Sequence, residues 1–266
     1  MLRRTEGIVL KTTPFGEADL IVTYLTPDFG ILKTFAKSPR KIKSRFGSSL
    51  EPLTQSRISF WDKETSNLPR LTQSDIICSF QSIRNTFNCY LKVLEIIELT
   101  LHFVPERDAN CRVYYLLLNS LQAIENNSSS FSQEGKGRLS FEDLIVTHYK
   151  VKFLKLNGYS PKLDACGRCG KRGNCFYVSH GSILCEDCAK SVDSPIKISP
   201  ALAKIHADLL SWDISKINRI RPPDKLLSEL SVIINMHVKY ILAKPLKAET
   251  FSHAINTHYF KKLLSI

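Results

Sequence analysis

Two pairs of cysteines constrain the fold of this 266-residue chain more than any other feature of its sequence. Cys166 and Cys169 enclose two residues, and fifteen residues later Cys185 and Cys188 enclose two more, so the segment reads C-x2-C-x15-C-x2-C. This spacing is typical of a structural zinc site, in which two knuckles supply four thiolates about 2.3 Å from one ion. Four protein ligands leave no position for a reacting water. We therefore expect one structural Zn²⁺ in an element at about 164–190.

The other cysteines leave some alternatives open. Cys175 and His180 lie between the two knuckles, and either would have to replace a thiolate of the symmetric arrangement to become a ligand. A redox-active pair is a further alternative for the knuckle cysteines. Cys78, Cys89 and Cys111 fall in apolar patterns and are predicted to be small core residues.

The first part of the chain has a strand-like pattern, in which β-branched and aromatic residues form short runs between Gly, Pro, Asp and Ser. Five strands are predicted, over residues 7–13, 19–26, 30–36, 53–61 and 68–77. Five short antiparallel strands predict a small closed barrel, of which the five-stranded OB-fold is one form. An SH3-like barrel suits the periodicity nearly as well. We expect the barrel domain to occupy residues 1–79.

After Cys78, apolar residues three and four apart replace the alternating pattern, which indicates helices. Helices are predicted over about 82–103, 111–124, 140–156, 200–212 and 224–243, with a loop over 126–137. The expected fold is therefore α+β and multidomain: an OB-fold barrel, then an α-helical domain over 80–266 that carries the four-cysteine zinc element.

The chain is strongly basic. Its 37 Lys and Arg against 25 Asp and Glu give a formal net charge of +12, which favours an anionic partner, most commonly nucleic acid. No acidic residue occurs between Phe29 and Leu50, and six basic residues fall there within thirteen positions. These candidate DNA-binding residues are Lys33, Lys37, Arg40, Lys41, Lys43 and Arg45. A merely solvated loop is the alternative. Phe35 and Phe46 nearby would either stack on bases or belong to the core.

Motifs of catalysis are missing from the sequence. It has no G-x-x-x-x-G-K-[ST], no G-x-G-x-x-G and no H-E-x-x-H, and the H-x-E element of zinc deaminases is also absent. Glu95 and Glu98 have helical spacing and are interpreted as a solvated helix face. We do not expect an enzyme. No apolar run long enough to span a membrane and no secretory signal are seen, so we expect a soluble, cytoplasmic protein.

Several segments, in this order and spacing, resemble the bacterial DNA repair protein RecO (recombination protein O) family over nearly the whole chain. In the predicted barrel they are GIVLKT at 7–12, GEADLIVT at 16–23, YLTPDFG at 24–30, FAKSPRK at 35–41 and KSRF at 43–46. In the helical part they are Tyr90 with Glu95, FLKLNGYSP at 153–161 and KPLK at 244–247. Ser38 stands where the family usually has glycine, so the turn there is expected to differ.

The resemblance implies a protein that binds single- and double-stranded DNA and anneals complementary strands without turning over a nucleotide. It also implies partners: RecR and the single-stranded-DNA-binding protein SSB, through the SSB C-terminal tail, with which the family helps load the RecA recombinase. A nucleoid-associated, cytoplasmic location follows from the same resemblance. Two competing interpretations remain, a zinc-containing protein-interaction adaptor and an RNA-binding factor, because barrels and zinc knuckles also serve RNA.

Overall fold

The structure is a computed structural model that describes residues 1–39, 45–62, 68–127, 139–190, 194–217 and 222–251. It divides into two compact units. The barrel unit comprises residues 1–86 and 100–125, and the helical unit comprises residues 87–99 and the described residues from 126 onward. Among the described residues, no helix is both long and apolar enough to cross a membrane.

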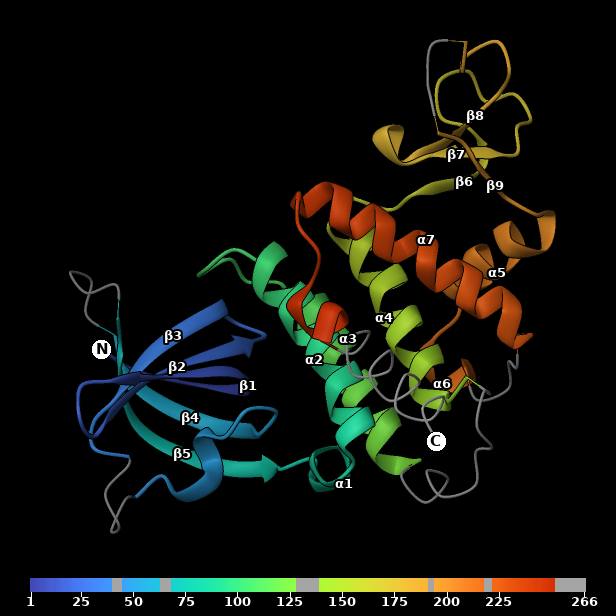
Figure 1. The fold of residues 1–266 in the computed structure, drawn as a ribbon. Coiled ribbons are helices and arrows are strands. Elements are labelled where there is room, and N and C mark those ends of the chain that lie inside the picture. The colour runs from blue at the N-terminus through green and yellow to red at the C-terminus, as the bar shows by residue number, and fades with distance from the viewer. Residues whose placement is uncertain (40–44, 63–67, 128–138, 191–193, 218–221, 252–266) are drawn as a thin grey trace, which may run out of the picture. The chain divides into compact units, whose positions relative to one another are not determined.

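The five predicted strands form a closed barrel in the order β1-β2-β3-β5-β4 (Figure 1). The strands are β1 (Leu2–Phe15), β2 (Asp19–Thr26), β3 (Gly30–Ala36), β4 (Gln55–Trp61) and β5 (Arg70–Cys78). All pairs are antiparallel except β3 with β5. The predicted OB-type barrel is confirmed. β1 is longer than predicted because its first half pairs with β4 and its second half pairs with β2.

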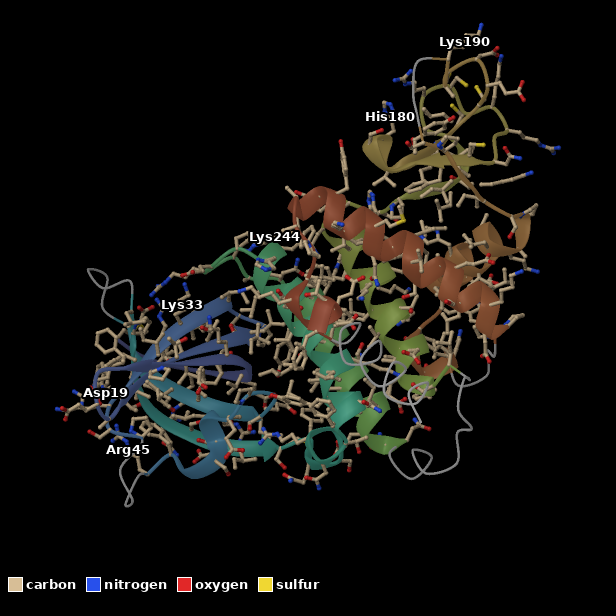
Figure 2. The ribbon with its side chains drawn as sticks, viewed as in Figure 1. Asp19, Lys33, Arg45, His180, Lys190 and Lys244 are labelled. Carbon is tan, nitrogen blue, oxygen red and sulfur yellow. The ribbon has the colours of Figure 1, made fainter. Side chains whose placement is uncertain are left out.

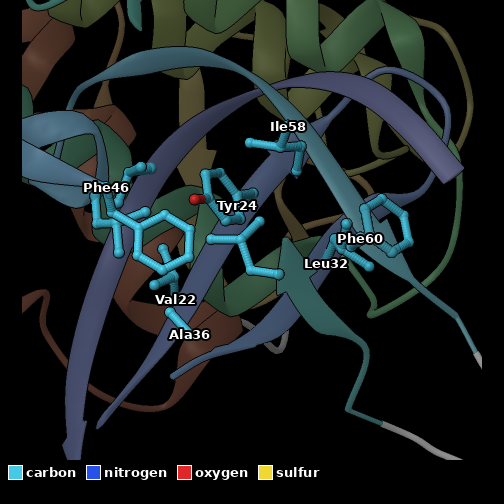
Figure 3. Packing of buried hydrophobic residues seen from close by; sticks show 10 residues of the cluster. Val22, Tyr24, Leu32, Ala36, Phe46, Ile58 and Phe60 are labelled. Atoms are coloured by element: carbon cyan, nitrogen blue, oxygen red, sulfur yellow. The ribbon is translucent and has the colours of Figure 1, made fainter. Parts of the chain in front are cut away.

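Side chains that alternate along these strands fill the barrel (Figure 3). Completely or almost completely buried members of this core are Val22, Tyr24, Leu32, Ala36, Ile58 and Phe60. Phe46 also belongs to it and is only 3% exposed. Phe46 precedes a short 3-10 helix, η1 (Gly47–Leu50). The sequence left open whether Phe46 stacks on bases or belongs to the core, and in the structure it is a core residue.

The helical series begins with α1 (Gln81–Asn85), α2 (Phe87–Phe103) and α3 (Cys111–Asn126). The helical run predicted over 82–103 is present but interrupted, because Thr86 has extended dihedral angles (φ −109°, ψ 100°) and separates α1 from α2. The Glu125 carboxylate accepts hydrogen bonds from the backbone N–H groups of Ser82 (3.0 Å) and Ile83 (3.1 Å). It thereby satisfies donors that a free helix start leaves unpaired.

The three cysteines predicted to lie in the core have different environments. Cys89 on α2 is buried as predicted, while Cys78 at the end of β5 is half-buried. The prediction for Cys111 was wrong, because this residue is the first of α3 and is exposed. An apolar pattern at a helix end does not determine which way the first side chain points.

The helical unit contains α4 (Phe141–Leu156), α5 (Pro200–Ser211), α6 (Ile214–Ile217) and α7 (Asp224–Leu242). The predicted N-cap of α5 is confirmed, since the Ser199 side chain accepts from Leu202 N–H and Pro200 is the first helical residue. Between α4 and α5 lies a four-stranded sheet in the order β6-β8-β7-β9, which was not predicted. Its strands are β6 (Lys162–Cys166), β7 (Cys175–Tyr177), β8 (Ser182–Leu184) and β9 (Ile196–Lys197).

A buried ion pair lies inside the helical unit. Lys150 of α4 donates to Glu95 of α2 (2.6 Å) and to the side-chain oxygen of Asn235 (2.8 Å), and its side chain is 2% exposed. The interpretation of Glu95 and Glu98 as a solvated face was therefore wrong. Glu95 is only 12% exposed, and Glu98 accepts backbone N–H groups of residues 247 and 248 at 3.0 Å.

Candidate functional site

The four knuckle cysteines converge on one point of the sheet-containing segment. The sulfur atoms of Cys166, Cys169, Cys185 and Cys188 all lie within 4.8 Å of one another, and those of Cys169 and Cys185 are 3.5 Å apart. A tetrahedral zinc with 2.3 Å bonds sets its ligand sulfurs about 3.8 Å apart. The cluster thus has the size and the donor set that a single thiophilic ion requires.

Two turns of the backbone bring these sulfurs together. In the first knuckle Gly170 N–H donates to Cys166 C=O (2.9 Å), and Gly170 takes a φ of 74°, which a side chain would disfavour. In the second knuckle the N–H groups of Cys188 and Ala189 both donate to Cys185 C=O (3.0 Å). Gly170 therefore permits the left-handed turn that closes the first knuckle.

The thiols of the cluster have shifted acidities. Burial raises the pKa of the Cys166 thiol, but backbone N–H groups of Cys185 and Cys169 outweigh this effect, so that the pKa falls to about 6. Hydrogen bonding of the Cys188 thiol to the sulfurs of Cys169 and Cys185 raises its pKa to about 12. Four thiolates so close together repel one another, and a divalent cation is the group that would offset their charge.

The two alternative ligands lie apart from this set. Cys175 is half-buried, and its sulfur is 3.4 Å from the side-chain oxygen of Asn174. His180 ends a short 3-10 helix, η3 (Val178–His180), and its Nε2 lies 3.4 Å from the guanidinium of Arg168. The metal-sized group among the described residues contains neither of them.

The basic segment follows β3 on the barrel unit. Arg40, Lys41 and Lys43 lie outside the described residues. Lys37 is exposed immediately after β3, and the Arg45 guanidinium lies 4.9 Å from the centre of the Phe46 ring. Figure 2 labels Lys33 and Arg45 on this unit.

Lys33 differs from the other basic candidates. It lies on β3 itself and forms an ion pair with Glu106, and both side chains are about half exposed. Because the partner offsets its charge, Lys33 contributes less to an anion-attracting field than Lys37 or Arg45. This pairing could not be predicted from the sequence, since Glu106 lies 73 residues away from Lys33.

Ser38 adopts a φ of 55°, the left-handed region in which a residue other than glycine is strained. Its N–H donates to the Asp19 carboxylate at 2.6 Å, which holds the turn after β3 against the turn before β2. The serine thus takes up a conformation that glycine would adopt without cost. The turn at this position is of the kind that suits glycine.

The sequence did not predict that two aromatic side chains of the barrel are exposed. Phe15 at the end of β1 is 52% exposed and Trp61 at the end of β4 is 51% exposed. Phe15 makes an edge contact with Phe35, with ring centres 5.9 Å apart. The first strand was predicted to end at residue 13, which placed Phe15 in a turn, so its contact with Phe35 was not expected.

Comparisons with known proteins match the chain along nearly its whole length. The family model described as Recombination protein O N terminal matches residues 1–80, and the one described as Recombination protein O C terminal matches residues 84–250. A DNA repair protein RecO from Thermodesulfovibrio yellowstonii is 40% identical over 244 residues, which cover 90% of this chain and 92% of the relative. Another from Dehalococcoides mccartyi is 31% identical over 249 residues, with 92% of each chain covered.

Proposed function

Because this chain belongs to the recombination protein O family of DNA repair and recombination proteins, we propose that it binds single- and double-stranded DNA and anneals complementary strands. The observation that carries the proposal is the acid-free basic segment on an OB-type barrel. A basic surface that holds two phosphate backbones lowers their repulsion and raises their encounter rate. Such a role needs no reaction step, so we propose a mediator and not an enzyme.

The proposed phosphate contacts are the basic candidates on β3 and in the segment that follows it: Lys33, Lys37, Arg40, Lys41, Lys43 and Arg45. Support comes from Lys37, which is exposed, and for which the described part of the chain supplies no ion-pair partner. Lys33 should contribute least, since Glu106 already pairs with it. Contacts of this kind position a backbone without reading its sequence.

We further propose that the four-cysteine cluster binds one Zn²⁺ with a structural role. Cys166, Cys169, Cys185 and Cys188 would each supply a thiolate, which fits the 4.8 Å limit on their separations and the preference of zinc for sulfur. Because the site is closed by four protein ligands, the ion would hold the knuckles of the β6–β9 segment together and would not activate water.

For the partners, we propose RecR and the C-terminal tail of SSB, and help in loading RecA onto SSB-coated DNA. Family membership supports this part of the proposal, and no contact residues are assigned. It also supports a cytoplasmic, nucleoid-associated location. We propose that residues 1–79 form the DNA-binding OB-fold domain and residues 80–266 the α-helical domain, with the zinc element inserted at about 164–190.

A salt series tests DNA binding. Anisotropy of labelled single-stranded, duplex and RNA oligonucleotides of equal length would be followed at several salt concentrations. Replacing Lys37 and Arg45 by alanine should weaken binding to all sequences and reduce the salt slope by about one unit for each lost contact. Lys225→Ala, which removes an exposed charge from α7, is the matched control. An unchanged slope would place the DNA surface elsewhere, and preference for RNA would favour the RNA-binding alternative.

A further inference from the structure

A row of exposed side chains crosses the outside of the barrel in one register. Leu2 of β1 lies opposite Trp61 of β4, Trp61 opposite Arg70 of β5, and Arg70 opposite Phe35 of β3. Directly paired residues point to the same face of a sheet. Leu2, Trp61 and Arg70 are exposed and Phe35 is half-buried, so this face is the outer one.

Aromatic rings and a cation alternate along this row. Neighbouring strands lie about 5 Å apart, so Trp61 and Phe35 start about 10 Å from each other with Arg70 between them. Phe15 extends the row, because its ring meets the edge of Phe35. We call Phe15, Phe35, Trp61 and Arg70 the aromatic band. Lys37 lies two residues beyond Phe35, just past the end of β3, and is exposed.

The charges around the band are suited to an anion. Within the described ranges, neither Arg70 nor Lys37 has an ion-pair partner. The nearest acid in sequence to Trp61 is Asp62, which is only 13% exposed and pairs with Arg3 and Arg107, each at 3.4 Å. Asp19, across from Phe15, accepts the N–H of Ser38. Asp62 and Asp19 therefore already have partners of their own. Glu17, in the turn after β1, is exposed.

We propose that the aromatic band stacks unpaired nucleobases and so gives the barrel a preference for single strands. The inference rests on the proposed DNA binding and deepens it. Exposed rings on a basic OB-type surface bind bases without regard to sequence, since every base has a π face, and a guanidinium between two rings can contact the linking phosphate or stack itself. In a duplex the bases stack on each other, so no base face is available to the aromatic side chains of the band.

Binding to three ligands of equal length separates base stacking from phosphate contact: a thymine oligonucleotide, an abasic oligonucleotide and a duplex. The variant Phe15→Leu/Trp61→Leu keeps an apolar side chain at both positions but removes both exposed rings. It should lose about fivefold to a hundredfold in affinity for the thymine strand for each stacked base, with affinities for the abasic strand and the duplex unchanged. The single variant Trp61→Phe keeps an aromatic ring and should retain most of the affinity for the thymine strand that Trp61→Leu loses. Phe87→Leu removes an equally exposed ring from α2 and should have no effect.

Fluorescence gives a second readout on the intact chain. Trp61 and Trp212 are its two tryptophans, so Trp212→Phe leaves Trp61 as the sole emitter. The thymine strand should quench this emission, and the abasic strand should not. Equal weakening for all three ligands, or unquenched emission at saturation, would overturn the stacking proposal while leaving DNA binding in place, and would point to a protein partner for the band. Failure of the unaltered protein to bind any DNA would instead remove the proposed function.

Discussion

The barrel unit and the helical unit differ in the polar groups that they bury. Among the described residues, the buried polar side chains of the barrel unit are hydroxyls and one amide, such as those of Thr26, Ser56 and Gln55. The helical unit buries ionisable groups instead: Glu142, His148, Lys150, His206 and His237. It also contains the four-cysteine cluster. An uncharged interior is insensitive to pH and metal, whereas buried ionisable groups make stability depend on both.

Removal of the metal should produce the largest difference in stability between the two units. Structural zinc contributes about 10–16 kcal/mol of apparent binding free energy in small metal-dependent domains. Cys169→Ser, or treatment with a strong chelator, should therefore abolish hydrogen-exchange protection over 162–190 while the barrel strands remain protected. Cys111→Ser, at an exposed cysteine outside the cluster, is the control. Metal analysis that finds no zinc in protein purified without chelator would contradict the site.

Breaking the buried ion pair should have the next largest effect. Lys150→Met leaves the Glu95 carboxylate in its 12% exposed position without its cation, which should cost about 3–5 kcal/mol of unfolding free energy. Lys150→Met/Glu95→Leu removes both charges and should recover most of that loss. Urea unfolding of the variants measures both values. A single variant as stable as the unaltered protein would show that the pair does not hold the helical unit together.

Acid should destabilise the helical unit selectively. Burial lowers the pKa of His148 from 6.5 to about 4, and burial likewise lowers the pKa of His206 to about 4. Since the unfolded chain binds these protons more readily, the stabilisation is complete above about pH 6.5 and is lost as pH falls toward 4. The loss should be about 2 kcal/mol for each histidine at pH 5.

Hydrogen exchange at pH 7 and pH 5, corrected for the intrinsic rate, measures this loss in each unit separately. His148→Gln retains an amide donor for the Trp212 carbonyl, which lies 3.2 Å from the ring Nε2, and should flatten the pH dependence. Equal losses of protection in the barrel strands would contradict the comparison between the units.

The smallest effect is predicted at Ser38 in the barrel unit. Ser38→Gly relieves the left-handed strain at φ 55° but adds freedom to the unfolded chain, so a net gain of up to about 1 kcal/mol is expected. Ser38→Ala keeps the strain and should bring no gain. Thermal unfolding compares the two variants, and equal melting temperatures would show that the turn is not strained.

Sequence patterns predicted those elements whose local signals are strong. The five strands, the Ser199-Pro200 helix start and the two cysteine knuckles each depend on residues a few positions apart. The β6–β9 sheet was missed because its strands have two to five residues, too few to show a period. α6, with four residues, was missed for the same reason.

Long-range pairings explain the remaining differences. Glu95 has the spacing of a surface acid, and only the approach of Lys150, 55 residues later, places it inside the unit. From the sequence Lys33 is one more unpaired cation of the basic segment, but in the structure it forms an ion pair with Glu106. The aromatic band depends on the register of four strands, which a single sequence does not specify before the barrel closes.

Strand annealing tests the central claim most directly. Complementary oligonucleotides coated with SSB would be mixed with and without the protein, in the absence of nucleotide, and duplex formation followed by fluorescence. The proposed role predicts faster annealing than SSB alone permits, since the protein brings two backbones together without a reaction step. Annealing no faster than with SSB alone, at a protein concentration that saturates naked DNA, would contradict the mediator role and favour an adaptor.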